Sequence, residues 1–235
     1  MACVDDFALF RVGARVLLVG ASGAGKSQFL LRAIQQRQQC FEVPPNRVLF
    51  CSHSGSALDN SDASGAGALV KEKNARGNKL VEFIDDVPGD EAILEPYTLL
   101  VFDDLLSDVK GASYVEKLLP YYLRKAHHEK LYCFVTVQTL FPRIKFFSTI
   151  SENANYLILF RTPRSMQQIR HFATQIAGAG NSRLITDIYQ MATKSKPYSY
   201  LYVSFHPQTD ESVQFLSNLF GEDGEQPCIV AYVAA

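Results

Sequence analysis

Short apolar runs alternate along the chain with longer stretches in which apolar residues recur at helical spacing. A short apolar run bounded by polar residues is typical of a strand that is buried on both faces of a parallel sheet. Strands of this kind, separated by helices, build an α/β fold in which helices flank a mainly parallel sheet. The pattern predicts strands at 15–19, 47–51, 79–84, 98–103, 131–137, 155–161 and 198–205, and helices at 26–38, 113–128, 165–177 and 181–192.

A glycine separates the last two predicted helices. Ser165 and Gln168 have the spacing of a capping box, in which each side chain satisfies a free backbone N–H at the helix start. Gly178 follows the last apolar residue at helical spacing, and glycine readily adopts the left-handed conformation that ends many helices. We therefore expect one helix to stop at Gly178 and the next to begin after it.

The residues between the first predicted strand and the first predicted helix have the full sequence of a P-loop. Glycines let such a loop turn with positive φ and bring its N–H groups close to phosphate oxygens, and the dipole of the following helix adds positive potential there. Lys26 supplies a charge for the β- and γ-phosphates, and the Ser27 hydroxyl is a ligand for Mg²⁺. The predicted nucleotide-binding residues are Gly20, Ala21, Ser22, Gly23, Ala24, Gly25, Lys26 and Ser27.

An apolar strand that ends in two acids supplies the second half of the predicted nucleotide site. Residues 97–104 read Tyr-Thr-Leu-Leu-Val-Phe-Asp-Asp, and a P-loop enzyme needs such a strand beside its P-loop strand. Asp103 is placed to hold Mg²⁺ through water, as the Walker B aspartate of P-loop enzymes does. Asp104 at the strand tip is placed to orient and deprotonate the attacking water. The pair predicts an enzyme that hydrolyses its nucleotide.

Another apolar strand, at 131–137, ends in the polar residue Gln138. Some P-loop enzymes have an additional strand between the P-loop strand and the Walker B strand, and a polar residue at its end senses the γ-phosphate or the attacking water. Gln138 fits that role, with a simple polar strand end as the alternative. The chain has no Asn-Lys-x-Asp sequence, the guanine-reading motif of signalling GTPases, so ATP with Mg²⁺ is the expected nucleotide.

The bulk composition favours a single ATPase domain over residues 1–235. A chain of 235 residues that is 47% hydrophobic can bury a full core. Residues 52–67 are mainly Ser, Gly, Asn and Asp, which predicts a mobile loop, and 206–235 form an acidic C-terminal segment. The apolar runs are too short for a membrane span, and the start of the chain lacks a secretion pattern, so we expect an intracellular protein. The five cysteines are scattered and predict reduced thiols without a metal site or disulfides.

A net charge of −1 for the whole chain conceals a strongly basic middle. Residues 124–196 carry eleven Lys and Arg against three acids, a net charge of +8, whereas residues 197–235 contain neither Lys nor Arg. One interpretation is a local surface that binds a polyanion such as DNA. The other is solvated helix faces together with arginines that serve the nucleotide. The sequence does not decide between them.

The stretch from Ala126 to Arg164 resembles the genome-packaging ATPases of the FtsK–HerA superfamily. The likeness is greatest to the poxvirus-type packaging ATPase of Maverick/Polinton elements and adintovirus-like DNA viruses. With the P-loop and Phe102-Asp103-Asp104-Leu105, it covers most of residues 14–220. The matching residues are His127-His128, Thr136-Val137-Gln138, Leu140-Phe141, Thr149-Ile150-Ser151, Asn153-Ala154, Tyr156-Leu157, Leu159-Phe160, Pro163-Arg164, Gln168-Ile169, Ala173, Gln175 and Pro197-Tyr198-Ser199-Tyr200-Leu201.

This resemblance implies a motor that pumps double-stranded DNA into a preformed capsid. It implies a RecA-like core that assembles as a homo-oligomeric ring, a hexamer or pentamer, with a capsid or portal protein as a further partner. The site of action would be the host-cell nucleus or cytoplasm where virions assemble. A ring motor also needs an arginine from the neighbouring subunit, and Arg164 matches the Pro-Arg of the family, with Arg161 and Arg143 as rivals. The chain departs from the family at Ser148, where the family has Arg, so either Lys145 or Arg143 substitutes for it or the trans-acting contact differs.

Two other functions fit the same motifs. A nucleotide-dependent assembly or adaptor protein would bind ATP as a switch, hydrolyse it slowly and use its basic block on an acidic protein partner. A DNA helicase of the same superfamily would share the core of the packaging motor. Asp104 favours hydrolysis over a switch, because a switch has little need of a second acid.

Overall fold

The computed structural model describes residues 9–52, 71–74, 76–89, 94–105, 111–221 and 228–233. Beyond Ser52, the loop predicted at 52–67 lies outside the described residues.

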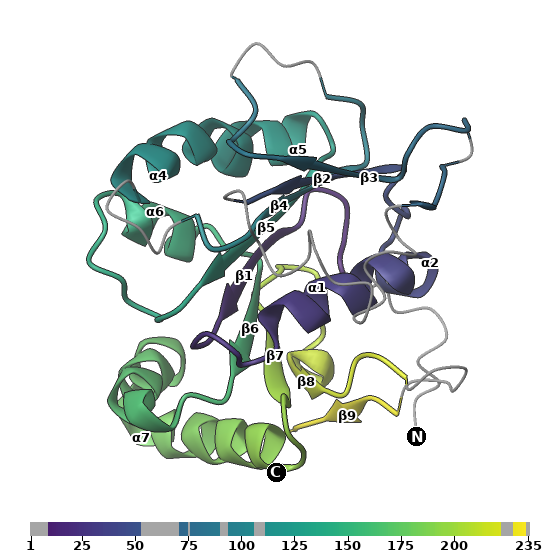
Figure 1. Ribbon diagram of the computed structural model, residues 1–235. Helices are drawn as coiled ribbons and strands as arrows, with labels where there is room; N and C mark the ends of the chain where they lie inside the picture. The colour runs from purple at the N-terminus through teal and green to yellow at the C-terminus, as the bar shows by residue number, and fades with distance from the viewer. Residues whose placement is uncertain are drawn as a thin grey trace.

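A nine-stranded sheet runs through the molecule (Figure 1). Its strand order is β3-β2-β4-β5-β1-β6-β7-β8-β9. The strands from β3 to β6 in this order are parallel, and the remaining three are joined by antiparallel pairs. This confirms the predicted mixed α/β fold with a mainly parallel sheet. The strands are β1 (Arg15–Val19), β2 (Arg47–Cys51), β3 (Val81–Ile84), β4 (Thr98–Phe102), β5 (Tyr132–Val137), β6 (Tyr156–Phe160), β7 (Tyr200–Ser204), β8 (Phe215–Ser217) and β9 (Val230–Ala231).

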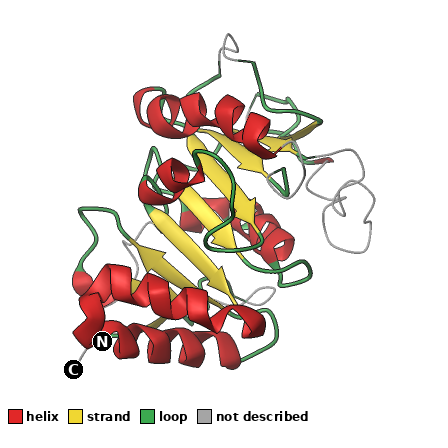
Figure 2. Ribbon diagram, turned by 90° about the vertical axis from the view of Figure 1, so that its left-hand side faces the viewer, coloured by secondary structure: helices red, strands yellow, loops and turns green. Residues whose placement is uncertain are grey.

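Helices cover both faces of this sheet (Figure 2). Alternate residues of β1 enter different cores: Leu17 and Val19 pack on one face, and Val16 and Leu18 on the other. Strands β4, β5 and β6 are buried throughout, as their continuous apolar sequences predict. The helices are α1 (Lys26–Gln35), α2 (Arg37–Cys40), α4 (Gly111–Pro120), a π-helical turn (Tyr121–Lys125), α5 (Ala126–His128), α6 (Phe147–Glu152) and α7 (Met166–Lys194), with 3-10 turns at Pro163–Ser165 and Glu211–Val213.

The two helices predicted on either side of Gly178 are both present, and α7 comprises the pair joined at a kink. Gly178 has a φ of 70° and a ψ of 170°, so the chain kinks there and resumes as a helix. The capping box predicted at its start is not formed, because Ser165 makes no side-chain cap and Gln168 instead accepts a hydrogen bond from the backbone N–H of Leu140. Gln168 thereby ties α7 to the loop that follows β5.

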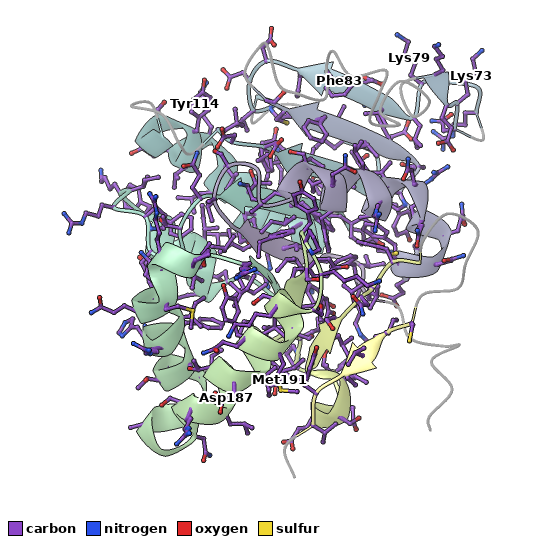
Figure 3. The ribbon with its side chains drawn as sticks, turned by 60° about the horizontal axis from the view of Figure 1, so that its bottom comes forward. Lys73, Lys79, Phe83, Tyr114, Asp187 and Met191 are labelled. Carbon is purple, nitrogen blue, oxygen red and sulfur yellow. The ribbon has the colours of Figure 1, made fainter. Side chains whose placement is uncertain are left out.

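The two outer parts of the sheet, at β3 and at β7 to β9, have different neighbours. Figure 3 shows Lys73, Lys79 and Phe83 at the β3 end, and Asp187 and Met191 on α7, which packs beside β7 and β8. The C-terminal segment supplies β8 and β9, and thus extends the sheet beyond the core strands. None of the helices in the described ranges is long and apolar enough to cross a membrane.

The described cysteines are all free thiols. Cys40, Cys51 and Cys133 are buried and Cys228 is exposed, and Cys3 lies outside the described ranges. Burial raises the pKa of the Cys40 thiol to about 12, which keeps it protonated and unreactive at neutral pH.

Candidate nucleotide site

The topology brings the P-loop, the acid pair and Gln138 to one edge of the sheet. Strands β1, β5 and β4 are neighbours and parallel, with Val19 paired to Val137 and Phe102 to Val135. Their carboxyl ends therefore lie side by side. Strand β5 lies between β1 and β4, which is the additional-strand arrangement expected from Gln138. Strand β5 thus separates β4, which carries the acids, from the P-loop strand β1.

Two of the three P-loop glycines have the positive φ that the sequence predicts, and the third, Gly20, does not but is needed for close packing. Gly23 and Gly25 have φ angles of 75° and 105°, in the left-handed region that other residues rarely adopt. A methyl group built on Gly20 would lie 2.7 Å from the Cβ of Phe160 on the neighbouring strand, so this position has room for glycine alone. Helix α1 begins at Lys26, immediately after Gly25, so its N-terminal N–H groups point into the loop.

The Lys26 side chain is folded into the loop. Its Nζ donates hydrogen bonds to the carbonyl oxygens of Gly20, at 2.6 Å, and Ala21, at 3.1 Å. Burial lowers the pKa of Lys26, while the nearby carboxylates of Asp103 and Asp104 oppose this shift. Phosphate oxygens are stronger acceptors for an ammonium than carbonyl oxygens are. The loop thus holds a positive charge that an entering phosphate can attract.

Ser27 and Asp103 present oxygen atoms to the same point. Ser27 Oγ lies 3.5 Å from Asp103 Oδ2, although the two residues come from α1 and the end of β4. Asp103 is only 8% exposed, and burial raises the pKa of its carboxyl, while the hydrogen bond from Thr136 and the charge of Lys26 lower it. A carboxylate that has lost much of its hydration gains most from a cation.

This donor set fits Mg²⁺. Mg²⁺ prefers oxygen ligands and is typically held by one or two protein groups together with phosphates and water. Among the described residues there is no group of three or more His, Cys, Asp or Glu that could hold a metal by themselves. The oxygens of Ser27 and Asp103 fit such an ion.

Thr136 joins the acid pair to β5, a contact that the sequence analysis missed. Its hydroxyl donates to Asp103 Oδ1 at 2.8 Å and accepts a hydrogen bond from the backbone N–H of Asp104 at 2.9 Å. The sequence does contain a signal for it, because Thr136 is a polar residue in an apolar run, two positions before Gln138. Side chains two positions apart share a face of a strand.

Asp104 and Gln138 lie together at the exposed rim of the site. Gln138 Nε2 donates a hydrogen bond to Asp104 Oδ1 at 3.3 Å. Asp104 has a φ of 55°, a left-handed conformation that turns the chain sharply after Asp103. The two carboxylates therefore differ in setting: Asp103 is buried beside Ser27, and Asp104 is exposed beside Gln138.

Arg164 lies just beyond the end of β6, in the 3-10 turn Pro163–Ser165, and is exposed. The start of this segment is fixed by Tyr189 of α7, whose hydroxyl donates to the carbonyl of Phe160 and accepts from the N–H of Thr162. Within the part of the chain described here, no hydrogen bond or ion pair links Arg164 to the P-loop, the acids or Gln138. Its rivals Arg161 and Arg143 are likewise exposed and have no such link. The structure thus brings together every predicted site residue except the arginine.

The basic residues of 124–196 do not share one face. Lys125 is buried, with its Nζ 4.4 Å from the centre of the Tyr121 ring, and Lys130 stands just before β5, at the opposite edge of the sheet from the P-loop. Because β7 runs antiparallel to β6, its start lies at the P-loop edge. The basic residues at this edge are Arg143, Lys145, Arg161, Arg164 and Lys196, which follow β5, follow β6 or precede β7.

Comparison with known proteins gives a fold but no family. No family model matches the sequence, and no curated protein matches it. Among solved structures, the chain is similar to the genome packaging NTPase B204 from Sulfolobus turreted icosahedral virus 2 in complex with sulfate. The two are 17% identical, with a TM-score of 0.50, over 83% of this chain and 93% of that one. They share a fold. The complex of the same NTPase with ATP-gammaS is 16% identical over 84% of this chain and 95% of that one, with a TM-score of 0.49.

Proposed function

We propose that the chain is an Mg²⁺-dependent ATPase that translocates double-stranded DNA during viral genome packaging. The observation that carries the proposal is the convergence of Lys26, Ser27, Asp103, Asp104 and Gln138 at one edge of the sheet. A shared fold alone does not establish a function. The residues of this site, however, supply the chemistry of nucleotide hydrolysis that a packaging NTPase with this fold would need.

Each residue of the site has a distinct part in hydrolysis. Ser27 and Asp103 would hold Mg²⁺, which when bound offsets charge on the phosphate oxygens. Lys26 bridges the β- and γ-phosphates. Gln138 and Asp104 orient a water molecule, and Asp104 accepts its proton as the water oxygen bonds to the γ-phosphorus. The bond from that phosphorus to the bridging oxygen then breaks, which leaves ADP and phosphate.

The finer identity follows from the resemblance in sequence. We infer a RecA-like motor of the FtsK–HerA superfamily, related to the packaging ATPases of Maverick/Polinton and adintovirus-like elements. The proposed form is a single domain over 1–235 that works as a homo-oligomeric ring, with Arg164 reaching the site of a neighbouring subunit. A capsid or portal protein is the proposed further partner, at the place in the host cell where virions assemble.

The proposed substrate of movement is duplex DNA. The basic residues at the P-loop edge support this, because Lys and Arg side chains bind phosphates without regard to sequence. Their position beside the nucleotide site would couple DNA contact to the state of the nucleotide.

ATP turnover with and without duplex DNA tests the proposal, with particle size recorded in the same sample. We expect turnover to rise when DNA is added and the DNA affinity to fall steeply as salt increases. The same sample should contain an oligomer. Unchanged turnover at saturating DNA, without an oligomer, would contradict the motor and leave an ATP-binding switch.

A further inference from the structure

Tyr198 is an exposed aromatic residue that lies against the P-loop. A methyl group built on Gly25 would lie 3.0 Å from the Cβ of Tyr198 and 3.3 Å from the Cδ1 of its ring. The side chain is nevertheless 68% exposed, so its contact with the loop leaves most of its surface open. The ring therefore has a face open to a ligand at the edge of the loop.

The backbone holds Tyr198 in place at some cost. Its φ is 63°, a left-handed conformation that is uncommon for a bulky residue. The surrounding turn is nonetheless well tied: the Ser199 hydroxyl accepts a hydrogen bond from the N–H of Lys196 and lies 3.0 Å from the hydroxyl of Ser195. An uncommon backbone conformation in a fixed turn points to a function for the side chain that it presents.

Tyr198 lies at the end of the nucleotide site opposite to Asp104 and Gln138. Asp104 and Gln138, which would meet the γ-phosphate, follow β4 and β5 on one side of β1. Tyr198 precedes β7, on the other side of β1 beyond β6. A triphosphate that lies in the P-loop with its γ-phosphate toward Asp104 must extend its nucleoside away from β4 and β5, and the start of α1 on that side is the point where Tyr198 leans on Gly25.

An aromatic cluster supports this side of the site. Phe29 of α1 and Phe160 of β6 both pack against Tyr200, with ring centroids 4.9 Å and 5.6 Å apart, respectively. These rings fix α1, β6 and the start of β7 relative to one another, so the distance from Tyr198 to the P-loop is set by a rigid core. A preformed aromatic face of this kind needs little ordering to bind a flat ligand.

We propose that Tyr198 is a nucleoside-binding residue whose ring stacks on the base of the bound nucleotide. The inference rests on the proposed function, because it needs the phosphates to occupy the P-loop. Stacking on an aromatic ring is tolerant of base identity, since every base has a π-face. The site would therefore accept other nucleoside triphosphates as well as ATP and would distinguish all of them from a bare phosphate chain.

The test compares ATP with inorganic tripolyphosphate, which has the phosphates but no base. Tyr198→Asn removes the ring without adding strain, because Asn tolerates a left-handed conformation. We expect this variant to bind ATP and GTP roughly 5- to 150-fold more weakly and tripolyphosphate as well as before, in line with the strength of stacking. Tyr198→Phe should bind all three ligands like the unchanged protein, and Lys26→Ala should bind all three more weakly.

Each outcome separates this inference from the proposed function. ATP affinity that is unchanged in Tyr198→Asn but reduced in Lys26→Ala would overturn the inference and leave the nucleotide site intact. An equal loss of ATP and tripolyphosphate in Tyr198→Asn would also overturn it, since the ring would then only support the loop. A folded, unchanged protein that binds neither ligand would overturn the proposed function itself.

Discussion

Replacing Asp104 with Asn should lower ATP turnover by roughly 10²- to 10⁴-fold, the usual contribution of a general base. ATP affinity should stay within a few-fold, because the phosphates are held by Lys26, Ser27 and the loop N–H groups. Asn suits the position in other respects: it tolerates a φ of 55° and offers an amide oxygen to Gln138 in place of the carboxylate. The loss would thus report the missing base and not a distorted turn. Single-turnover hydrolysis and nucleotide binding, measured on the same preparation, separate the two quantities.

Asp103→Asn is the matched control for that experiment. It changes the neighbouring carboxylate, which lies beside Ser27 and accepts from Thr136. We expect this variant to need much more Mg²⁺ for nucleotide binding, an effect that Asp104→Asn should not show. If turnover is already negligible in the unchanged protein and Asp104→Asn leaves it so, the switch function replaces the motor.

Arg164→Ala should lower turnover by roughly 10³- to 10⁵-fold in the assembled protein, the range known for an arginine supplied in trans. The side chain is exposed and has no hydrogen bond or ion pair to the site within its own subunit, in the part of the chain that the structure describes. The chain just before it is held by Tyr189, whose hydroxyl bonds to Phe160 and Thr162. Arg161→Ala and Arg143→Ala, measured in parallel, distinguish the three arginines.

Mixing inactive subunits shows whether the arginine acts across an interface. An Arg164→Ala subunit has an intact P-loop, and a Lys26→Ala subunit has an intact Arg164. Mixed oligomers should recover part of the turnover at interfaces that combine the two intact parts. Assembly of both variants into mixed oligomers without any recovery would place Arg164 outside the trans contact.

Much of the sheet could be predicted from the sequence because its strands have clear limits. The run at 16–19 is apolar and is followed by glycine, and together with Arg15 it forms β1 at the predicted residues. The six-residue helix α6 was missed because it is too short for a helical period to be distinct. The strands β8 and β9 were missed because strands of three and two residues contain no recognisable alternation.

The chemistry of the site was predicted in its parts but not in its arrangement. Lys26 and the acids could be expected from motifs, since each residue type has a fixed role at its spacing. The position of β5 between β1 and β4 was expected from Gln138, but the hydrogen bonds of Thr136 to Asp103 and Asp104 depend on the register of the two strands, which the sequence does not encode locally. The contact of Tyr198 with Gly25 joins the turn before the antiparallel strand β7 to the P-loop, and no local pattern encodes it.

Movement along DNA is the central claim, and displacement of a third strand from duplex DNA measures it directly. A triplex-forming oligonucleotide on a long duplex is removed only by a protein that travels through it. We expect displacement that requires ATP and Mg²⁺ and is lost in Asp104→Asn, although that variant still binds ATP and DNA. Rapid ATP turnover by DNA-bound oligomers that leave the third strand in place would contradict movement along DNA.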